Sequence, residues 1–397
     1  FKYYNFFIGI VQQVFVWMGL SVQIPLLRML LPIGLSFHTF QAMSYTLEVY
    51  YENQKAEKNF GIYALYVMFY PQLVAGPVER PQNVLYQFYE KHSLRYEDVA
   101  SGLRQMMWGM IKKVVIADRL GLVTARIFDD PSAQSGINVV IGFVFFTFQI
   151  YCDFSGYSDI AVGTARVMGF NLMKNFNFPF RAKNVSDFYK RWHMSLSTWF
   201  NDYLHTPLTY SFRRMGLYGV ALASVITFFL SGLWHGSAWQ FILWGVMMGL
   251  AIAFEVLTQK QRKAFFARFP EKLGNVVGKV ITFSNVSFWS LFIRANSVAD
   301  AFKMMRKVGD IPAELATIVR THKFGFLNLP NVYDYLVPGL AVICLLEGCN
   351  WVTTRFDMPK TFANRPSWLR WSVYYAGILL LIFCGVYEKH QFIYFQF

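Results

Sequence analysis

Charged side chains are scarce in this sequence. Asp, Glu, Lys and Arg together supply only 15% of the 397 residues, and none of them occurs between Arg214 and Glu255. Hydrophobic residues supply 55%, aromatic residues supply 19%, and the mean hydropathy is +0.32. A composition this apolar excludes an ordinary soluble domain and indicates an integral membrane protein.

Acidic residues are also outnumbered, with 23 Asp and Glu against 37 Lys and Arg, for a formal net charge of +14. In a membrane protein this excess indicates cytoplasmic loops that face anionic lipid headgroups. No signature of RNA or DNA binding accompanies it, so nucleic acid is not an expected partner. Only four cysteines occur, and Cys349 follows Cys344 too distantly for a Cys-x-x-Cys pair. We therefore predict neither a disulfide framework, nor a metal site, nor a permanently bound cofactor.

The motifs of several common reactions are missing as well. No Gly-x-Ser-x-Gly elbow is present to form a covalent acyl-enzyme, and no Gly-x-x-x-x-Gly-Lys loop is present to bind phosphate. Asp153 and Asp159 are six residues apart and would not share a helical face, so a paired-carboxylate site is poorly supported. We expect both to anchor backbone or basic groups, where the polar cluster Asp153–Asp159 interrupts a helix.

Long uncharged runs mark the predicted membrane spans. The uncharged runs close to one span in length, besides the one between Arg214 and Glu255, are Tyr3–Leu27, Met29–Leu47, Asn59–Val78, Pro131–Cys152 and Trp371–Tyr387. Val280–Ile293 begins a further crossing, and Val332–Val352 is the weakest predicted span because it contains Asp334 and Glu347 near its ends. A mixed helix over Gly102–Arg126 is predicted at the interface or inside the bundle. Together they predict an all-α polytopic membrane protein, with residues 1–397 as a single domain of roughly ten helices. Because the chain starts at Phe1 with an apolar run, we expect preceding sequence to be missing.

The most informative stretch is the uncharged run that contains His235. It is about twice as long as one span requires, so it predicts two helices with a break at Gly232–Gly236. Basic residues at both ends, Arg213 and Arg214 before it and a basic loop after it, place the ends in the cytoplasm and His235 within or beyond the bilayer. An ionisable residue in such a place is a functional-site candidate. The alternative is a histidine bonded to a carbonyl inside a helix contact.

A second candidate histidine lies in a predicted amphipathic helix. We expect this helix to start with Ser186 as its N-cap and Asp187 in its first turn. Trp192, Leu196 and Trp199 would share one face, and His193 would lie on another, presented at the membrane surface.

The other five histidines are weaker candidates. His92, His322 and His390 lie among polar residues, His38 is expected to bond a neighbouring helix, and His205 precedes Pro207 in a predicted turn.

A histidine with a pKa near neutrality can take the proton of a hydroxyl that attacks an acyl carbonyl. His235 and His193 therefore point to acyl transfer by general-base catalysis.

Several stretches spread over nearly the whole chain resemble the membrane-bound O-acyltransferases. The resemblance is to the bacterial branch that includes the alginate O-acetyltransferase membrane subunit and the related teichoic acid D-alanyl transfer protein. The matching stretches are Ser36–Tyr45, Pro71–Arg80, Asp153–Asp159, Asn175–Phe180, Arg191–Trp199, Gly232–Gly236 and Phe392–Phe395.

The resemblance implies a ring of transmembrane helices around a thinned centre, with a funnel that meets a cytoplasmic opening at a catalytic histidine. Carried onto this sequence, the catalytic histidine is His235, and His193 is a second motif histidine. The other positions of the matched motifs that we expect to support the site are Trp234, Asp153, Ser155, Asp159 and Arg191.

The family activity implies substrates and partners. The donor would be a cytoplasmic thioester, acetyl-CoA or an acyl carrier thioester. The acceptor would be a polysaccharide outside the cytoplasm, reached through a periplasmic or extracellular acetyltransferase partner, and the location would be the bacterial inner membrane in contact with lipid.

The chain departs from the family pattern at two places, and three alternative functions remain to be distinguished. Met248 stands where many relatives have a histidine, and Thr209–Arg214 replaces a Gly-Gly-Asn stretch, which puts donor or partner contacts there in doubt. D-alanyl transfer to teichoic acid is the close alternative. A transporter with His235 as a proton relay, or a scaffold without catalysis, are alternatives from other classes.

Overall fold

The fold is built from helices. The computed structural model describes residues 3–27, 34–73, 76–321, 332–356, 365–387 and 392–393, and within these ranges no strand occurs. The longer helices are α1 (Tyr4–Trp17), α2 (Leu35–Tyr50), α3 (Phe60–Val67), α5 (Tyr96–Met110), α6 (Asp118–Asp129), α7 (Gly136–Val167), α11 (Leu217–His235), α12 (Trp239–Leu257), α13 (Gln259–Phe266), α14 (Glu271–Arg294), α15 (Val298–Val308), α16 (Ile311–Thr321), α17 (Val332–Arg355) and α19 (Ser367–Cys384). The shorter ones are α4 (Pro81–Val84), α8 (Val185–Tyr189), α9 (Met194–Phe200), α10 (Thr206–Ser211), the 3₁₀ turns Tyr70–Gln72, Leu85–Tyr89, Pro179–Arg181 and Arg213–Met215, and the π-helical segments Ile111–Ala117 and Asn201–His205.

Six helices within the described ranges are long and apolar enough to cross a membrane. They are α7, α11, α12, α14, α17 from Leu336, and α19. The expectation of roughly ten spanning helices is therefore not confirmed, and the chain is a multi-pass protein with fewer long helices than its uncharged runs suggested. The 16 residues of α2 span only about 24 Å. The run Asn59–Val78 forms the eight-residue α3 followed by a turn at Pro71, where a helix cannot continue easily.

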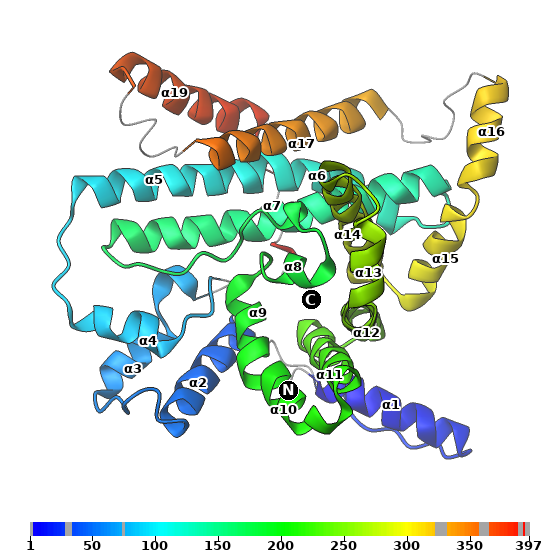
Figure 1. The fold of residues 1–397 in the computed structure, drawn as a ribbon, viewed down its shortest axis with the longest axis horizontal. Helices are drawn as coiled ribbons and strands as arrows, with labels where there is room; N and C mark the ends of the chain where they lie inside the picture. The colour runs from blue at the N-terminus through cyan, green and yellow to red at the C-terminus, as the bar shows by residue number, and fades with distance from the viewer. Residues whose placement is uncertain are drawn as a thin grey trace.

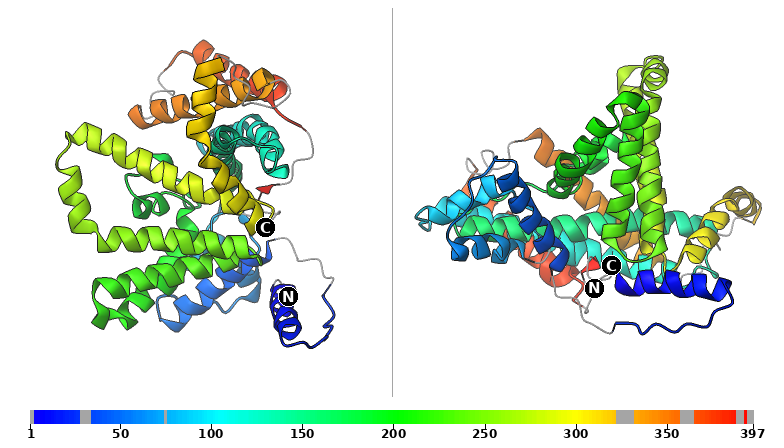
Figure 2. Two further views of the ribbon diagram at one scale, coloured as in Figure 1. Left: turned by 90° about the vertical axis from the view of Figure 1, so that its right-hand side faces the viewer. Right: turned by 90° about the horizontal axis from the view of Figure 1, so that it is seen from below.

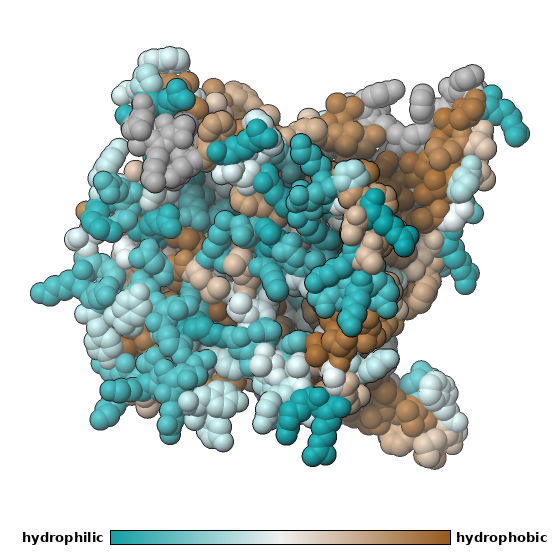
Figure 3. All heavy atoms as spheres, viewed as in Figure 1, coloured by the Kyte–Doolittle hydropathy of each residue, from teal (hydrophilic) through white to brown (hydrophobic). Residues whose placement is uncertain are grey.

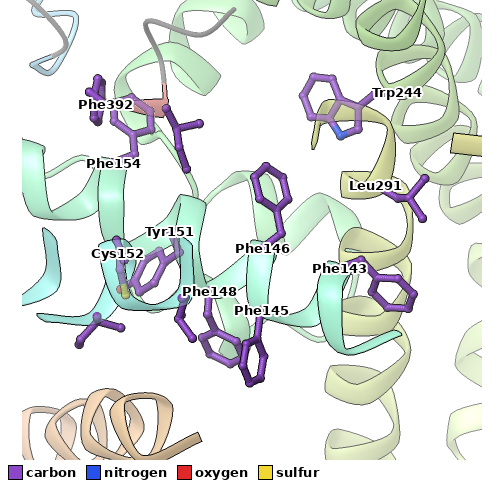
Figure 4. Close-up of a cluster of buried hydrophobic side chains, with 14 of the residues drawn as sticks. Phe143, Phe145, Phe146, Phe148, Tyr151, Cys152, Phe154, Trp244, Leu291 and Phe392 are labelled. Carbon is purple, nitrogen blue, oxygen red and sulfur yellow. The ribbon is translucent and has the colours of Figure 1, made fainter. Parts of the chain in front are cut away.

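The long helix α7 organises the interior. It runs without a break through Asp153–Asp159, so the predicted interruption there is wrong. Lys112, Lys113 and the amide of Ile393 bind the carboxylates of Asp153 and Asp159. These polar side chains are therefore paired inside the protein, and the helix can continue through them. Phe143, Phe146 and Phe154 of α7 belong to the main hydrophobic core, which also includes Trp244 of α12 and Leu291 of α14 (Figure 4).

Close backbone approach joins α5 to α7. A Cβ atom on Gly109 would lie 2.6 Å from the carbonyl oxygen of Gly156, and one on Gly102 would lie 2.6 Å from that of Gly163. Only glycine permits such contact, so the two helices run side by side (Figure 1). On the other side of α5 lies α19, where Gly377 packs on Met107. The mixed helix predicted over Gly102–Arg126 is thus packed inside the protein, as α5, the π-helical segment and α6.

The uncharged run between Arg214 and Glu255 forms the hairpin of α11 and α12, which confirms the prediction of two helices. The break covers Gly236–Ala238, because Gly232 is still helical and the predicted break was placed too early. Gly245 and Gly249 form a Gly-x-x-x-Gly pair that lets α12 pack tightly against α11. In Figure 2 the hairpin projects away from the layer that contains α5 and α7.

The surface separates by polarity. Figure 3 shows hydrophilic side chains gathered over the centre of one face, around α13, whereas α1 is largely hydrophobic. The basic segment predicted as a loop after α12 includes α13, which carries Lys260, Arg262 and Lys263. In α19 the apolar side chains of Leu379, Ile382 and Phe383 are exposed, as expected for a surface that faces lipid.

Candidate functional site

A cavity of about 640 Å³ lies between α7, α9, α11, α12 and α14. One face of α11 lines it from Val220 to His235, and the fifteen steps between these two residues correspond to about 22 Å at 1.5 Å per residue. The residues that line the cavity include Phe154, Lys190, His193, His205, Ser224, Thr227, Ser231, His235, Trp244 and Val256. One end of the cavity therefore lies near the basic ends of the hairpin, and the other end lies at His235.

His235 is the last residue of α11 and is partly exposed to the cavity. Its imidazole packs edge-on against two indole rings, with centroid distances of 4.9 Å to Trp234 and 5.1 Å to Trp244. The ring of Trp234 packs against Phe37 and Phe40 of α2, and Trp234 is not a lining residue of the cavity. Trp234 thus packs directly against His235.

His193 lies in the same cavity but not in the predicted setting. The helix expected from Ser186 is two helices, α8 and α9, separated by a turn at residues 190–193, and its N-cap is Asn184, whose side chain accepts from the Asp187 amide. His193 is in the left-handed region (φ 44°), which few non-glycine residues adopt. Its side chain is buried, with 3% exposure, so the prediction that it is presented at the membrane surface is wrong.

Asn175 holds this turn in place. Its side-chain oxygen Oδ1 accepts from the backbone N–H of Ser195 (3.2 Å), the hydroxyl of Ser195 (2.9 Å) and Nδ1 of His193 (3.0 Å). Its backbone oxygen accepts from the amide of Met194 at 2.8 Å. The ring of Phe154 packs edge-on against the imidazole of His193 at 4.5 Å. Nε2 of His193 is buried and has no hydrogen-bond partner among the described residues.

The cavity lining carries no acidic side chain among the described residues, and Lys190 is its basic member besides the histidines. Burial lowers the pKa of His193 well below its usual 6.5, and a charge on His235 would lower it further. Burial also lowers the pKa of His205, whose Nε2 lies 3.1 Å from the hydroxyl of Ser224. The lowered pKa favours the neutral imidazole of His193, which can accept a hydrogen bond through one of its ring nitrogens.

The predicted supporting residues of α7 lie outside this cavity. Asp153 forms an ion pair with Lys113 (2.6 Å) and accepts from the amide of Ile393 (2.8 Å). Asp159 forms an ion pair with Lys112 at 2.5 Å, and Lys112 also donates to the hydroxyl of Ser155 at 2.9 Å.

The two carboxylates thus anchor basic groups and backbone, as predicted, although within a continuous helix. This network holds α7 to the π-helical segment Ile111–Ala117 and to the residues near the C-terminus. Of the matched stretch Phe392–Phe395, Tyr394 and Phe395 lie outside the described residues.

Arg191 is also a structural residue of the turn. Its Nε donates to Asp187 at 2.9 Å, and its backbone oxygen accepts from the amide of Asn177. It does not line the cavity. His38 was expected to bond a neighbouring helix, and its Nε2 lies 3.0 Å from the carbonyl oxygen of Leu73, which directly follows the 3₁₀ turn Tyr70–Gln72.

Three residues of the site, His205, Phe154 and Asn175, were not predicted from the sequence. His205 was assigned to a turn, but it ends a π-helical segment and lines the cavity. Phe154 and Asn175 both occur in stretches that match the family, although neither was recognised as a neighbour of His193. His92 bonds the carbonyl oxygen of Gln87 and packs on Phe170, while His322 and His390 lie outside the described residues.

Comparison with known proteins agrees with this architecture. The profile of the membrane-bound O-acyltransferase family matches residues 51–296. The probable alginate O-acetylase AlgI of Pseudomonas aeruginosa is 35% identical over 366 residues, which are 92% of this chain and 67% of that protein. The peptidoglycan O-acetyltransferase of Helicobacter pylori is 31% identical over 77% of this chain and 61% of its own. The teichoic acid D-alanyltransferase of Streptococcus thermophilus is 27% identical over 64% of this chain and 66% of its own. The chain spans about half to two thirds of the length of the relatives it matches.

Proposed function

Because this chain belongs to the membrane-bound O-acyltransferase family, we propose that it transfers an acetyl group from a cytoplasmic thioester donor to a hydroxyl outside the cytoplasm. The donor is acetyl-CoA, and the final acceptor is an extracytoplasmic polysaccharide. The protein acts in the bacterial inner membrane, with a periplasmic or extracellular acetyltransferase as its partner. The names of the relatives from Pseudomonas aeruginosa and Helicobacter pylori support this class of acceptor.

The observation that carries this proposal is the cavity along α11. It extends about 22 Å from the basic end of the hairpin to His235, which is long enough for the extended thiol arm of a thioester donor. The absence of acidic side chains from its described lining suits a donor that carries phosphate groups. Ser224, Thr227 and Ser231 supply hydroxyls along one wall, and the small size of these side chains leaves the space open.

His235 is the general base in this mechanism. Its neutral imidazole takes the proton of the acceptor hydroxyl as the hydroxyl oxygen attacks the thioester carbonyl carbon. The tetrahedral intermediate then collapses, the carbon–sulfur bond breaks, and the imidazolium returns the proton to the leaving thiolate. The products are an O-acetyl ester and a free thiol, with no net change in protons. Trp234 and Trp244 fix the plane of the imidazole, which keeps it in a reactive orientation.

Replacement of His235 tests the mechanism. His235→Gln should lower O-acetylation of the cell-surface polymer by about 10²- to 10⁴-fold, the usual contribution of a general base. The measurement is acetate released from the polymer by mild base, normalised to the amount of protein in the membrane. His92→Gln is the matched control, because His92 packs on Phe170 away from the cavity. Normal acetylation in His235→Gln would refute the mechanism and favour a non-catalytic scaffold.

D-alanyl transfer is the second candidate, because a teichoic acid D-alanyltransferase is 27% identical over 64% of this chain. The same cavity would then receive the thioester of a carrier protein. Release of D-alanine rather than acetate from the envelope polymer by mild base would support this function over acetylation. A transporter that uses His235 as a proton relay would show neither product.

A further inference from the structure

The side-chain amide of Asn175 has a defined orientation. The backbone N–H of Ser195 can only donate, and it lies 3.2 Å from the atom assigned as Oδ1 of Asn175. The opposite atom, Nδ2, lies 3.2 Å from the hydroxyl of Ser158, which can accept. A flipped amide would place an NH₂ group against the N–H of Ser195, which is repulsive. The oxygen of Asn175 therefore faces His193.

This orientation determines which nitrogen of His193 carries the proton. Nδ1 of His193 lies 3.0 Å from Oδ1 of Asn175, and an amide oxygen can only accept. A neutral imidazole in this position must carry its proton on Nδ1. Nε2 then has a free lone pair, and it is buried without a partner among the described residues. An unpartnered buried acceptor is costly in a finished core, so it indicates a group that is completed by a ligand.

Among the described residues, the groups packed around the imidazole of His193 include three aromatic rings, which carry no hydrogen-bond donor for Nε2. Rings of Phe37, Phe154 and Phe176 lie 4.5–6.4 Å from the imidazole, measured between centroids. His193 lines the cavity that also contains His235, and a donor group that enters this cavity is the available partner for Nε2.

We propose that Asn175 is a positioning residue that holds His193 in its Nδ1–H tautomer, so that Nε2 accepts a hydrogen bond from a substrate N–H or O–H in the cavity. The proposal rests on the proposed function, since the substrate is the thioester donor or the hydroxyl acceptor of that reaction. His235 and His193 then have different roles. His235 takes the proton, whereas His193 orients the substrate through Nε2, which Asn175 keeps unprotonated.

Loss of the Asn175 amide should change Nε2 of His193 from a hydrogen-bond acceptor into a donor. The hydroxyl of Ser195 lies 2.9 Å from Oδ1 of Asn175 and 3.5 Å from Nδ1 of His193. In Asn175→Ala this hydroxyl loses its acceptor and becomes free to donate to Nδ1. The imidazole proton would then move to Nε2, and the nitrogen that faces substrate would become a donor. Asn175→Asp keeps an acceptor oxygen toward Nδ1, and the hydroxyl of Ser158 can turn to donate to its second oxygen.

The tautomer can be measured without reference to activity. The full-length protein is labelled with ¹⁵N-histidine, reconstituted in bilayers and studied at neutral pH by solid-state NMR, and the His193 signals are assigned by their loss in His193→Gln. The wild type and Asn175→Asp should show protonated Nδ1 and unprotonated Nε2, whereas Asn175→Ala should show the reverse. Asn177→Ala is the matched control, since the side chain of Asn177 accepts a hydrogen bond from Lys174 and forms none with His193 among the described residues, so this substitution should leave the tautomer unchanged.

Kinetics supply the second readout. Asn175→Ala should lower kcat for acetyl transfer by about 10²-fold or more, with rescue in Asn175→Asp and little effect in Asn177→Ala. A protonated Nε2 in the wild type, or an unchanged tautomer in Asn175→Ala, would overturn the proposal. If Asn175→Ala does not fold, the spectra of the wild type and Asn175→Asp still show whether Nδ1 or Nε2 of His193 carries the proton. Absence of acetyl transfer in the wild type, together with the expected tautomer there, would refute the proposed function and leave the tautomer assignment standing.

Discussion

The close contact between α11 and α12 makes Gly245 a sensitive position for catalysis. A Cβ atom at Gly245 would lie 2.3 Å from the carbonyl oxygen of Phe228 and 3.0 Å from Cα of Gly232. Ordinary contacts of this kind are about 3.5 Å, so Gly245→Ala must separate the two helices by about 1 Å. His235 lies one turn beyond Gly232 on α11, and Trp244, which contacts its imidazole, is adjacent to Gly245 on α12. The substitution therefore shifts the imidazole of His235, the proposed general base, relative to the indole ring of Trp244 that packs against it.

A misplacement of about 1 Å at a reacting group can lower the rate about 10²-fold, which is the loss expected for Gly245→Ala. The assay is thiol release from acetyl-CoA in membranes that contain the protein, together with the thermal unfolding midpoint. Gly348→Ala is the matched control: it is the same substitution within a helix, α17, but nothing lies within 4 Å of the added Cβ. Wild-type activity and stability in Gly245→Ala would refute the argument that this contact sets the position of His235.

Three further predictions concern stability. Lys112→Met and Asp159→Asn should each lower the unfolding midpoint, because each leaves the other partner of the ion pair uncompensated. In a double-mutant cycle, the double variant should lose less unfolding free energy than the two single variants added together, by about 0.5–3 kcal/mol. Burial raises the pKa of Glu79 from 4.5 to about 7, so its contribution to stability is present below about pH 4.5 and is lost as pH rises through about 7. Glu79→Gln should remove this loss in unfolding curves recorded between about pH 5 and 8. Burial lowers the pKa of His193 below 6.5, so the folded state should lose stability as pH falls below about 6.5, and His193→Gln should reduce that loss.

Much of the membrane architecture could be predicted from hydropathy, while the local breaks could not. The uncharged run around His235 predicted the hairpin of α11 and α12, because a bilayer core requires about 20 apolar residues for each helix. The interruption predicted at Asp153–Asp159 was wrong, because Lys112, Lys113 and the amide of Ile393 supply partners to these carboxylates from distant parts of the chain. The surface helix predicted around His193 was wrong for a similar reason. Contacts from Asn175 stabilise a left-handed turn that local periodicity does not indicate.

The sequence by itself determined that this is an apolar, all-helical membrane protein with a histidine at the end of an uncharged run, because composition and run length depend on no contact between distant residues. Only the tertiary structure decided that His193 and His235 share one cavity, that Phe154 and His205 line it, and that Asp153 and Asp159 do not. Those facts depend on the packing of α7, α9 and α11 against one another. The orientation of the Asn175 amide, which sets the protonated nitrogen of His193, likewise follows from a hydrogen bond between residues twenty positions apart.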